Sequence, residues 1–239
     1  MMIRVINCLP FFFIVLSIIR CMSPNITEIQ EWQGQGQKIK TIFGELTIFD
    51  TSNSELPENF IYDIAFDKND NIWVGSWSKG IAVFNGNVWK NFDTINSNIP
   101  NGTIYTIIAD CKNHIWCGTA NGLAKFDGTS WTVFKPENSP MQVPAVATIG
   151  IDKENTIWLS CGNVLEGGLM TFDGKNWELY TPENSILPCR AIDKILIDEN
   201  NVKWIGTIQY QGNGGLVKIK GKIWKLYNKS NSIMPYNSV

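Results

Sequence analysis

Acidic and amide side chains gather in one short segment, residues 67–71, whose sequence is Asp-Lys-Asn-Asp-Asn. Oxygen atoms at alternate positions of such a segment could bind a calcium ion. Related segments recur at residues 110–113, 152–155 and 198–201. All of them lack the glycine and the distant glutamate of an EF-hand loop. Because Asp and Asn also favour tight turns by bonding to their own backbone, we predict turns without a metal or other cofactor.

The carboxylates could also serve hydrolysis. Asp63, Asp193 and Glu166 would be candidates for the carboxylate pair of a glycosidase if they faced a common channel. His114 is the single histidine, which leaves no plausible Ser-His-Asp triad and no histidine-rich zinc site. We therefore expect no catalytic activity, with a polysaccharide-active enzyme as the alternative.

The six cysteines do not occupy equivalent places in the repeat described below, whereas a structural metal site or a repeated disulfide would recur with it. Cys111 and Cys117 flank one predicted hairpin, and they could pair. Disulfides are compatible with an exported protein, but this chain does not require one.

A repeat of about 42 to 47 residues organises the chain. An Asp is followed six residues later by a Trp at positions 73, 116, 158 and 204, which are 43, 42 and 46 residues apart. A second Trp follows at 89, 131, 177 and 224, and an Asn-Ser pair begins at 53, 96, 138, 184 and 231. Three markers with one spacing indicate stacked or radial repeats, and the recurring Trp residues are typical of an aromatic core between sheets.

Each unit is predicted to contain four short strands. In the first unit we expect strands at residues 61–66, 72–75, 80–84 and 88–92, with a tight hairpin at Asn85-Gly86 in which both residues tolerate positive φ. No convincing helical period occurs after residue 24. Four antiparallel strands in a unit of this length predict an all-β fold, a β-propeller whose blades cover one another.

The order of motifs resembles the two-component regulator propeller repeat: Asp-x-x-x-x-Ile-Trp-x-Gly-Thr, then Gly-Leu, Phe-Asp-Gly-x-x-Trp and Asn-Ser-x-Leu-Pro. The second unit carries it most clearly, at Asp110, Ile115, Trp116, Gly118, Thr119, Gly122, Leu123, Phe126, Asp127, Gly128 and Trp131. The resemblance covers residues 41–239, with departures such as Leu159-Ser160 in unit three and Ile219-Lys220 in unit four. It implies a ring of about seven blades and, in many members, a periplasmic sensor of oligosaccharides in hybrid histidine kinases.

We expect a partial blade at residues 40–59 and four blades at about 60–100, 101–143, 144–189 and 190–239. In the partial blade, Leu46 and Phe49 align with the last strand of a full unit. Three outcomes fit an incomplete array: a fragment of a longer propeller or scaffold, an oligomer joined through open sheet edges, or a small distorted ring.

The front of the chain predicts export. Residues 5–19 are nearly all apolar. This segment is shorter than the roughly 20 residues that a transmembrane helix needs, but its length suits a signal sequence within residues 1–23, followed by a polar linker at 24–39. Ile18-Ile19-Arg20-Cys21 resembles a bacterial lipoprotein signal with Cys21 as the lipid attachment site, although Arg20 departs from that pattern. Ordinary cleavage after Ser23 is the alternative. The expected location is the periplasm, the outer membrane or the cell surface.

Non-repeated loops are the candidates for ligand binding, because a rigid scaffold positions them. Units three and four are longer between their second and third strands, and Trp77 occupies the same loop in unit one. The candidate residues are Trp77, Asn163, Glu166, Arg190, Gln209, Tyr210 and Gln211. Their aromatic and amide groups suit sugars, so we expect a small molecule, an oligosaccharide or a protein as partner. A net charge of −2 gives no basic field for nucleic acid.

Overall fold

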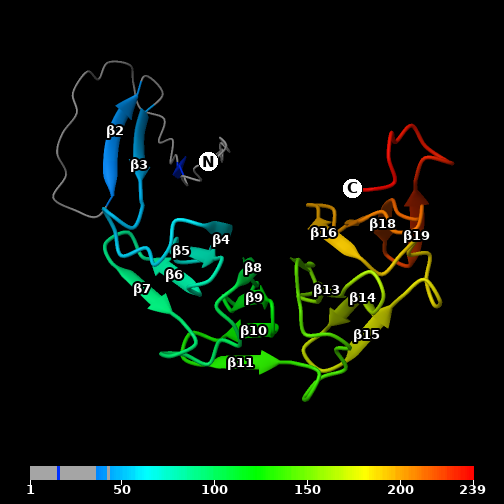
Figure 1. Cartoon of the computed structure of the whole chain (residues 1–239), viewed down its shortest axis with the longest axis horizontal. Coiled ribbons are helices and arrows are strands. Elements are labelled where there is room, and N and C mark those ends of the chain that lie inside the picture. Colours follow the sequence, from blue (N-terminus) through cyan, green and yellow to red (C-terminus); the bar gives the residue numbers. More distant parts are fainter. Residues whose placement is uncertain (1–14, 17–35, 42–43) are drawn as a thin grey trace.

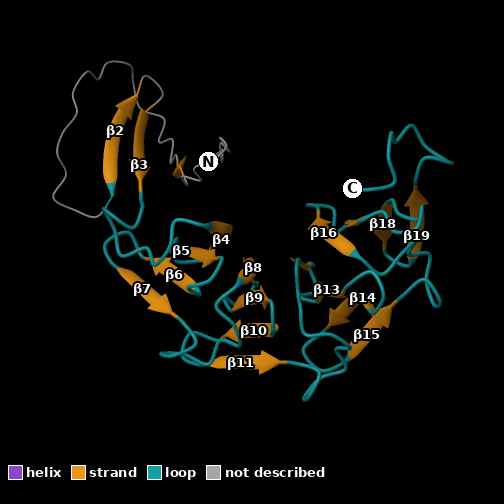
Figure 2. Cartoon of the chain, viewed as in Figure 1, coloured by secondary structure: helices purple, strands orange, loops and turns teal. Residues whose placement is uncertain are grey.

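A computed structural model describes residues 15–16, 36–41 and 44–239 of the 239-residue chain. The described residues form strands and loops without a helix (Figure 2). The strands are β1 Val15–Leu16, β2 Gln37–Thr41, β3 Gly44–Ile48, β4 Ile61–Phe66, β5 Ile72–Ser76, β6 Ile81–Phe84, β7 Trp89–Phe92, β8 Ile104–Ala109, β9 Ile115–Thr119, β10 Gly122–Phe126, β11 Trp131–Phe134, β12 Ile149–Ile151, β13 Ile157–Gly162, β14 Gly167–Phe172, β15 Trp177–Tyr180, β16 Ile192–Ile197, β17 Lys203–Thr207, β18 Leu216–Lys220 and β19 Ile223–Tyr227. No helix of the described part is long and apolar enough to cross a membrane.

Four sheets of four antiparallel strands follow one another along an arc (Figure 1). They are β4–β7, β8–β11, β12–β15 and β16–β19, each with its strands in chain order. The first strand of a sheet lies on the inside of the arc and the last strand on the outside. The predicted all-β propeller with four blades is therefore confirmed, and the four strands expected in unit one lie within one residue of their observed bounds.

The partial blade is also present. It consists of β2 and β3, which pair antiparallel, with β1 added along β3. Phe49 follows β3 and packs its ring 5.0 Å from that of Phe84 and 5.4 Å from that of Trp89. The aromatic residue at the end of a last strand thus covers the next blade, as its alignment with Phe92 predicts. The predicted signal sequence within residues 1–23 and Cys21 lie outside the described residues, apart from Val15–Leu16 of β1.

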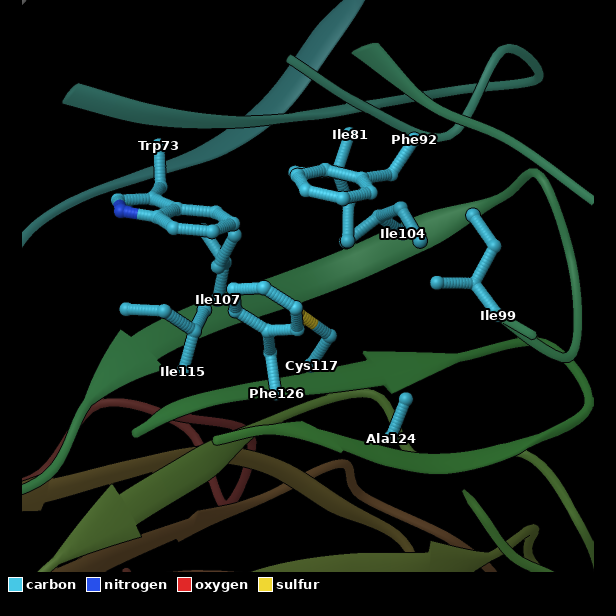
Figure 3. Close-up of a cluster of buried hydrophobic side chains, with 10 residues drawn as sticks. All are labelled: Trp73, Ile81, Phe92, Ile99, Ile104, Ile107, Ile115, Cys117, Ala124 and Phe126. Atoms are coloured by element: carbon cyan, nitrogen blue, oxygen red, sulfur yellow. The ribbon is translucent and has the colours of Figure 1, made fainter. Parts of the chain in front are cut away.

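The blades are joined by an aromatic core. Trp73 stacks on Phe92 with ring planes only 5° apart, and Phe126 of the next blade packs against both rings. Figure 3 shows Trp73, Ile81 and Phe92 of the first blade facing Phe126, Cys117 and Ala124 of the second. Apolar burial between neighbouring sheets holds the array together, since neither face of a lone blade could be covered otherwise.

The six-residue spacing between Asp and Trp has a direct structural cause. Each indole Nε1 donates a hydrogen bond to the Asp at the preceding turn: Trp73 to Asp67 at 3.0 Å, Trp116 to Asp110 at 3.1 Å, Trp158 to Asp152 at 2.9 Å and Trp204 to Asp198 at 3.2 Å. The same carboxylates accept backbone N–H groups of their own turns. Turn formation therefore accounts for these Asp residues, in agreement with the sequence interpretation.

The fourth residue of this turn also links neighbouring blades. Asn113, Asn155 and Asn201 have positive φ, and their Oδ1 atoms accept N–H bonds from Lys68, Cys111 and Lys153 of the preceding blade. Asn tolerates the left-handed region because its short polar side chain bonds locally. This link between blades was not predicted from the sequence.

The closing Asn-Ser pair protects the outer edge of each blade. The Nδ2 atoms of Asn96, Asn138, Asn184 and Asn231 donate to carbonyl oxygens of Asn91, Val133, Leu179 and Leu226, in the last strand of each sheet. The serine that follows bonds back to the start of the same turn. An exposed strand edge invites pairing with other chains, so these amides occupy acceptors that a foreign strand would use.

The predicted hairpin at Asn85-Gly86 is present between β6 and β7, and the Asn85 N–H donates to the Val88 carbonyl at 3.2 Å. Of the two residues only Gly86 has positive φ, while the Asn85 side chain accepts the N–H groups of Asn87 and Val88. Cys111 and Cys117, which could have paired, are both free thiols. Cys117 points into the core between the blades, whereas Cys111 lies on an exposed turn.

Candidate functional site

The loops between second and third strands lie at the same end of the blades as the segments that join one blade to the next. Backbone hydrogen bonds connect them: Trp77 N–H to the Phe60 carbonyl at 3.0 Å, and Ile208 N–H to the Ala191 carbonyl at 3.0 Å. The Asp turns and the hairpins between third and fourth strands occupy the other end, because the strands alternate in direction. The candidate loops therefore share one face of the array, as expected.

Four aromatic rings meet on this face, and we call them the aromatic cluster: Phe60, Tyr62, Trp77 and Tyr105. The ring centroid of Tyr62 lies 5.1 Å from Trp77, 5.7 Å from Phe60 and 5.6 Å from Tyr105. Phe60 also contacts Trp77 at 5.6 Å. Phe60, Tyr62 and Trp77 are 40%, 41% and 47% exposed. Rings this exposed contribute little to the core, so the cluster presents apolar surface to solvent.

Polar groups border the aromatic cluster. The Glu58 carboxylate accepts the Ser78 backbone N–H at 2.8 Å and the Ser78 hydroxyl at 3.0 Å, which holds the residue after Trp77 in place. Partial burial and the neighbouring Tyr105 raise the pKa of Tyr62, so its hydroxyl stays protonated at neutral pH. The cluster thus combines ring surfaces with hydroxyl groups that donate and accept hydrogen bonds.

Sequence reasoning identified Trp77 but missed its three neighbours. A signal for two of them was present, since Tyr62 and Tyr105 occupy the same position of the first strand, 43 residues apart, where units three and four have Ala147 and Asp193. An aromatic residue that recurs in only two adjacent units is not required by the core of every blade. This half-repeated position distinguishes a local surface from the general packing pattern.

The candidate loop of unit three is held by its own side chains. The Asn163 Oδ1 accepts the N–H groups of Leu165 and Glu166, and Glu166 itself is exposed. Arg190 donates to the Gly167 carbonyl at 2.8 Å and pairs with the Glu183 carboxylate at 2.7 Å. Asn163, Glu166 and Arg190 thus lie in one neighbourhood, with the Arg190 guanidinium already engaged within the chain.

The unit-four loop lies beside them. Tyr210 and Asn213 exchange both backbone hydrogen bonds, at 2.7 and 2.9 Å, and Gln211 between them has φ of 50°. Cys189 contacts the Ile208 carbonyl, which places Arg190 near the residue before Gln209. The described contacts do not connect Tyr210 to the aromatic cluster, so the candidate residues divide into two groups on different blades.

The three carboxylates considered for hydrolysis have separate surroundings. Asp63 accepts the N–H groups of Ile64 and of Ile107 in the next blade, which is a structural role. Asp193 and Glu166 are exposed on different blades. Among the described residues, no three His, Cys, Asp or Glu side chains come together in a way that would hold a metal ion.

One segment of the chain matches a known family. Residues 55–78 match the family described as two component regulator propeller, and this stretch contains Phe60, Tyr62 and Trp77. No curated protein sequence matches the chain.

Solved structures share the fold at low identity. The extracellular domain of BT3049 from B. thetaiotaomicron, described as a hybrid two component system, has 23% identity and a TM-score of 0.60 over 72% of this chain and 24% of that one. PorZ, a surface component of the type-IX secretion system of Porphyromonas gingivalis, has 16% identity and a TM-score of 0.57 over 85% of this chain and 32% of that one. A streptogramin B lyase has 15% identity and a TM-score of 0.57 over 72% and 55%.

The chain spans about a quarter of the length of the two-component extracellular structure. At these identities the similarity shows the fold alone. The four-stranded blades and the match at residues 55–78 agree with that fold. The chain is thus an array of β-propeller blades, of which residues 55–78 match the two component regulator propeller family.

Proposed function

We propose that this chain is an exported, non-catalytic β-propeller module of the bacterial envelope, and that the aromatic cluster binds a small molecule or oligosaccharide. The single observation that carries the proposal is the group of four touching rings, three of them at least 40% exposed. Exposed aromatic surface of this kind costs solvation free energy unless a partner covers it.

The cluster suits the ligand chemistry of a sugar. Indole and phenol rings contact the apolar C–H faces of a pyranose, while the Tyr62 and Tyr105 hydroxyls and the Ser78–Glu58 pair offer hydrogen bonds to its hydroxyl groups. Removing one stacked ring from a binding site typically costs more than 1 kcal/mol of binding free energy. Two rings acting together would therefore dominate the affinity for a short oligosaccharide.

Export and a sensory role are supported by the sequence and by similar structures rather than by the aromatic cluster. The apolar segment at residues 5–19 is typical of a signal sequence, with Cys21 as a candidate lipid attachment site. Two of the similar structures are an extracellular domain of a two component system and a bacterial surface component. A non-catalytic role is supported by Asp63, whose carboxylate oxygens accept the backbone N–H groups of Ile64 and of Ile107 in the next blade.

The test measures binding of a panel of neutral and acidic oligosaccharides by isothermal titration calorimetry. We expect one class to bind, and the double substitution Trp77→Ala with Tyr62→Ala to weaken it at least about tenfold. Tyr236→Ala is the matched control, because Tyr236 is an exposed aromatic residue, 71% exposed, outside the cluster. Unchanged affinity in the double variant would show that the cluster is not the site. Turnover of a glycan would favour the enzyme alternative.

A further inference from the structure

A second surface with the features of a binding site lies on the outer rim, between the first two blades. Two adjoining hollows of about 580 and 480 Å³ share Ser97 and Asn98, and we call them together the rim groove. Both hollows are open to solvent rather than enclosed. The rim groove lies along β7 and β11, the last strands of their sheets, whereas the aromatic cluster involves the first strands β4 and β8.

Edge strand β11 and the chain beyond it form one wall of the rim groove. Trp131, Val133 and Lys135 follow at every second position and therefore project to the same side of the strand. The facing wall is β7 together with the segment 94–100 that leads to the second blade.

The lining carries positive charge and mixes polar with apolar groups. It contains Lys90 and Lys135 but no Asp or Glu, amides and hydroxyls of Asn91, Thr94, Asn96, Ser97, Asn98, Thr129, Ser130 and Asn138, and the apolar side chains of Phe92, Ile99, Pro100, Phe126, Trp131 and Val133. Asp93, Asp127 and Glu137 adjoin lining residues in the sequence, and the first two accept N–H groups of their own turns. A ligand in the rim groove would meet two ammonium groups, which favours an anionic one.

Two buried polar atoms in the lining residues lack a hydrogen-bond partner. They are the indole Nε1 of Trp131 and the amide Oδ1 of Asn91. Asn91 is fixed in this orientation, because its Nδ2 donates to the Glu55 carbonyl at 2.9 Å. Both atoms are enclosed by protein, as is the indole Nε1 of Trp89, so a ligand in the rim groove meets the amide and hydroxyl groups of the lining instead. These groups both donate and accept hydrogen bonds, which matches the N–H and C=O groups of a peptide backbone.

The rings of the rim groove do not offer a platform for a sugar. Trp131 packs against Phe92 at 5.6 Å and against Phe126 at 5.0 Å, and both phenylalanines are buried. Strand addition is also hindered, since side-chain amides already bond the Asn91 and Val133 carbonyls. A ligand must therefore be recognised through charge and through hydrogen bonds to side chains.

We propose that the rim groove binds an extended acidic peptide segment of a partner protein. Its carboxylates meet Lys90 and Lys135, and its backbone forms hydrogen bonds with the amides and hydroxyls of the lining, among them Ser97 and Asn98, which line both hollows. This site is independent of the aromatic cluster and of any ligand bound there.

The probe is a fluorescein-labelled octapeptide of alternating Glu and Thr, measured with the full chain by fluorescence anisotropy. We expect saturable binding that Lys90→Glu weakens about tenfold or more. The matched control is Lys225→Glu, because Lys225 lies 4.7 Å over the Tyr227 ring just as Lys90 lies 4.8 Å over the Phe92 ring, but it does not line the groove. The control should bind the peptide within about twofold of the unchanged protein. Melting curves of both lysine variants identify a loss of binding that is caused by unfolding.

Three results would overturn the proposal: no saturable anisotropy change up to about 1 mM protein, equal weakening by Lys90→Glu and Lys225→Glu, or stronger competition by an oligogalacturonate than by the unlabelled peptide. The last outcome would assign the rim groove to an anionic glycan.

Discussion

The contact between the third and fourth blades contains a buried ion pair that its counterparts lack. Lys203 Nζ lies 3.1 Å from Asp152 Oδ2, with side chains 9% and 5% exposed, and 5.3 Å from the centre of the Trp158 ring. The other three units carry an isoleucine at the Lys203 position: Ile72, Ile115 and Ile157. Because this is the only described interface with the ion pair, substitutions in the pair change the stability of one interface and leave the contacts of the other interfaces unchanged.

The two partners should respond unequally to substitution. Asp152→Ala leaves an ammonium group buried without its carboxylate, which typically costs about 3 to 5 kcal/mol of unfolding free energy. Lys203→Ile restores the residue of the other interfaces, and Asp152 keeps the Trp158 indole at 2.9 Å and the Thr156 N–H at 2.8 Å. We expect this second change to cost about 1 kcal/mol or less, since apolar replacement of a buried pair is often close to neutral.

Urea titrations followed by circular dichroism measure both values. Asp67→Ala is the control, because Asp67 makes the same bonds to its turn and to Trp73 without a lysine partner. The excess cost of Asp152→Ala over Asp67→Ala therefore estimates the penalty of the unpaired ammonium group. Equal costs for these two variants, or a larger loss for Lys203→Ile than for Asp152→Ala, would refute the reasoning.

Three further predictions concern the repeat. Burial is the largest single influence on the pKa of Asp110 and raises it, but the hydrogen bonds together outweigh burial and lower the pKa from 3.8 to about 2. About 2 kcal/mol of stability that is present above pH 4 should therefore be lost as the pH falls towards 2. The urea midpoints at pH 7 and pH 3 should differ less in Asp110→Asn than in the unchanged protein. Trp116→Ala should cost about 3 to 5 kcal/mol, and Trp204→Ala less, because Trp116 is 3% exposed and Trp204 is only half-buried; equal melting temperatures would contradict this. Gly118→Ala should destabilise more than Gly86→Ala in the same assay, because a methyl group at Gly118 would lie 2.4 Å from a carbonyl oxygen of the next blade, whereas Gly86 has open space.

The sequence predicted the repeated part of the structure because every marker serves each blade in the same way. Asp67 and Trp73 form one hydrogen bond, and the same spacing forms it in every unit. The Asn96-Ser97 pair likewise forms hydrogen bonds at the edge of its blade that recur at the same spacing in the other units. A contact that recurs at a fixed spacing is visible in a single chain without knowledge of the coordinates.

Contacts between units were less accessible. The bond from the Lys68 N–H to the Asn113 amide joins residues 45 positions apart, and nothing in either turn alone indicates its partner. Tyr62 and Tyr105 likewise meet only because β4 and β8 lie side by side. The arrangement of blades, rather than a local pattern, determines these distances.

Both proposed sites contain residues that do not recur in every unit. Neither Phe60 nor Trp77 recurs in the other units, and Asn91 of the rim groove has Val133 as its counterpart in the second unit. A residue that one blade carries and its neighbour replaces without loss of the fold is not required by the architecture.

Since the aromatic cluster and the rim groove both lie between the first two blades, on inner and outer strands respectively, one molecule could hold two ligands at once. Titrating the acidic peptide in the presence of a bound oligosaccharide would measure the coupling free energy between the two sites, which we expect to be close to zero because no described contact connects Tyr105 with Trp131. A change in peptide affinity of more than about fivefold would show that the two blades shift against each other when a ligand binds.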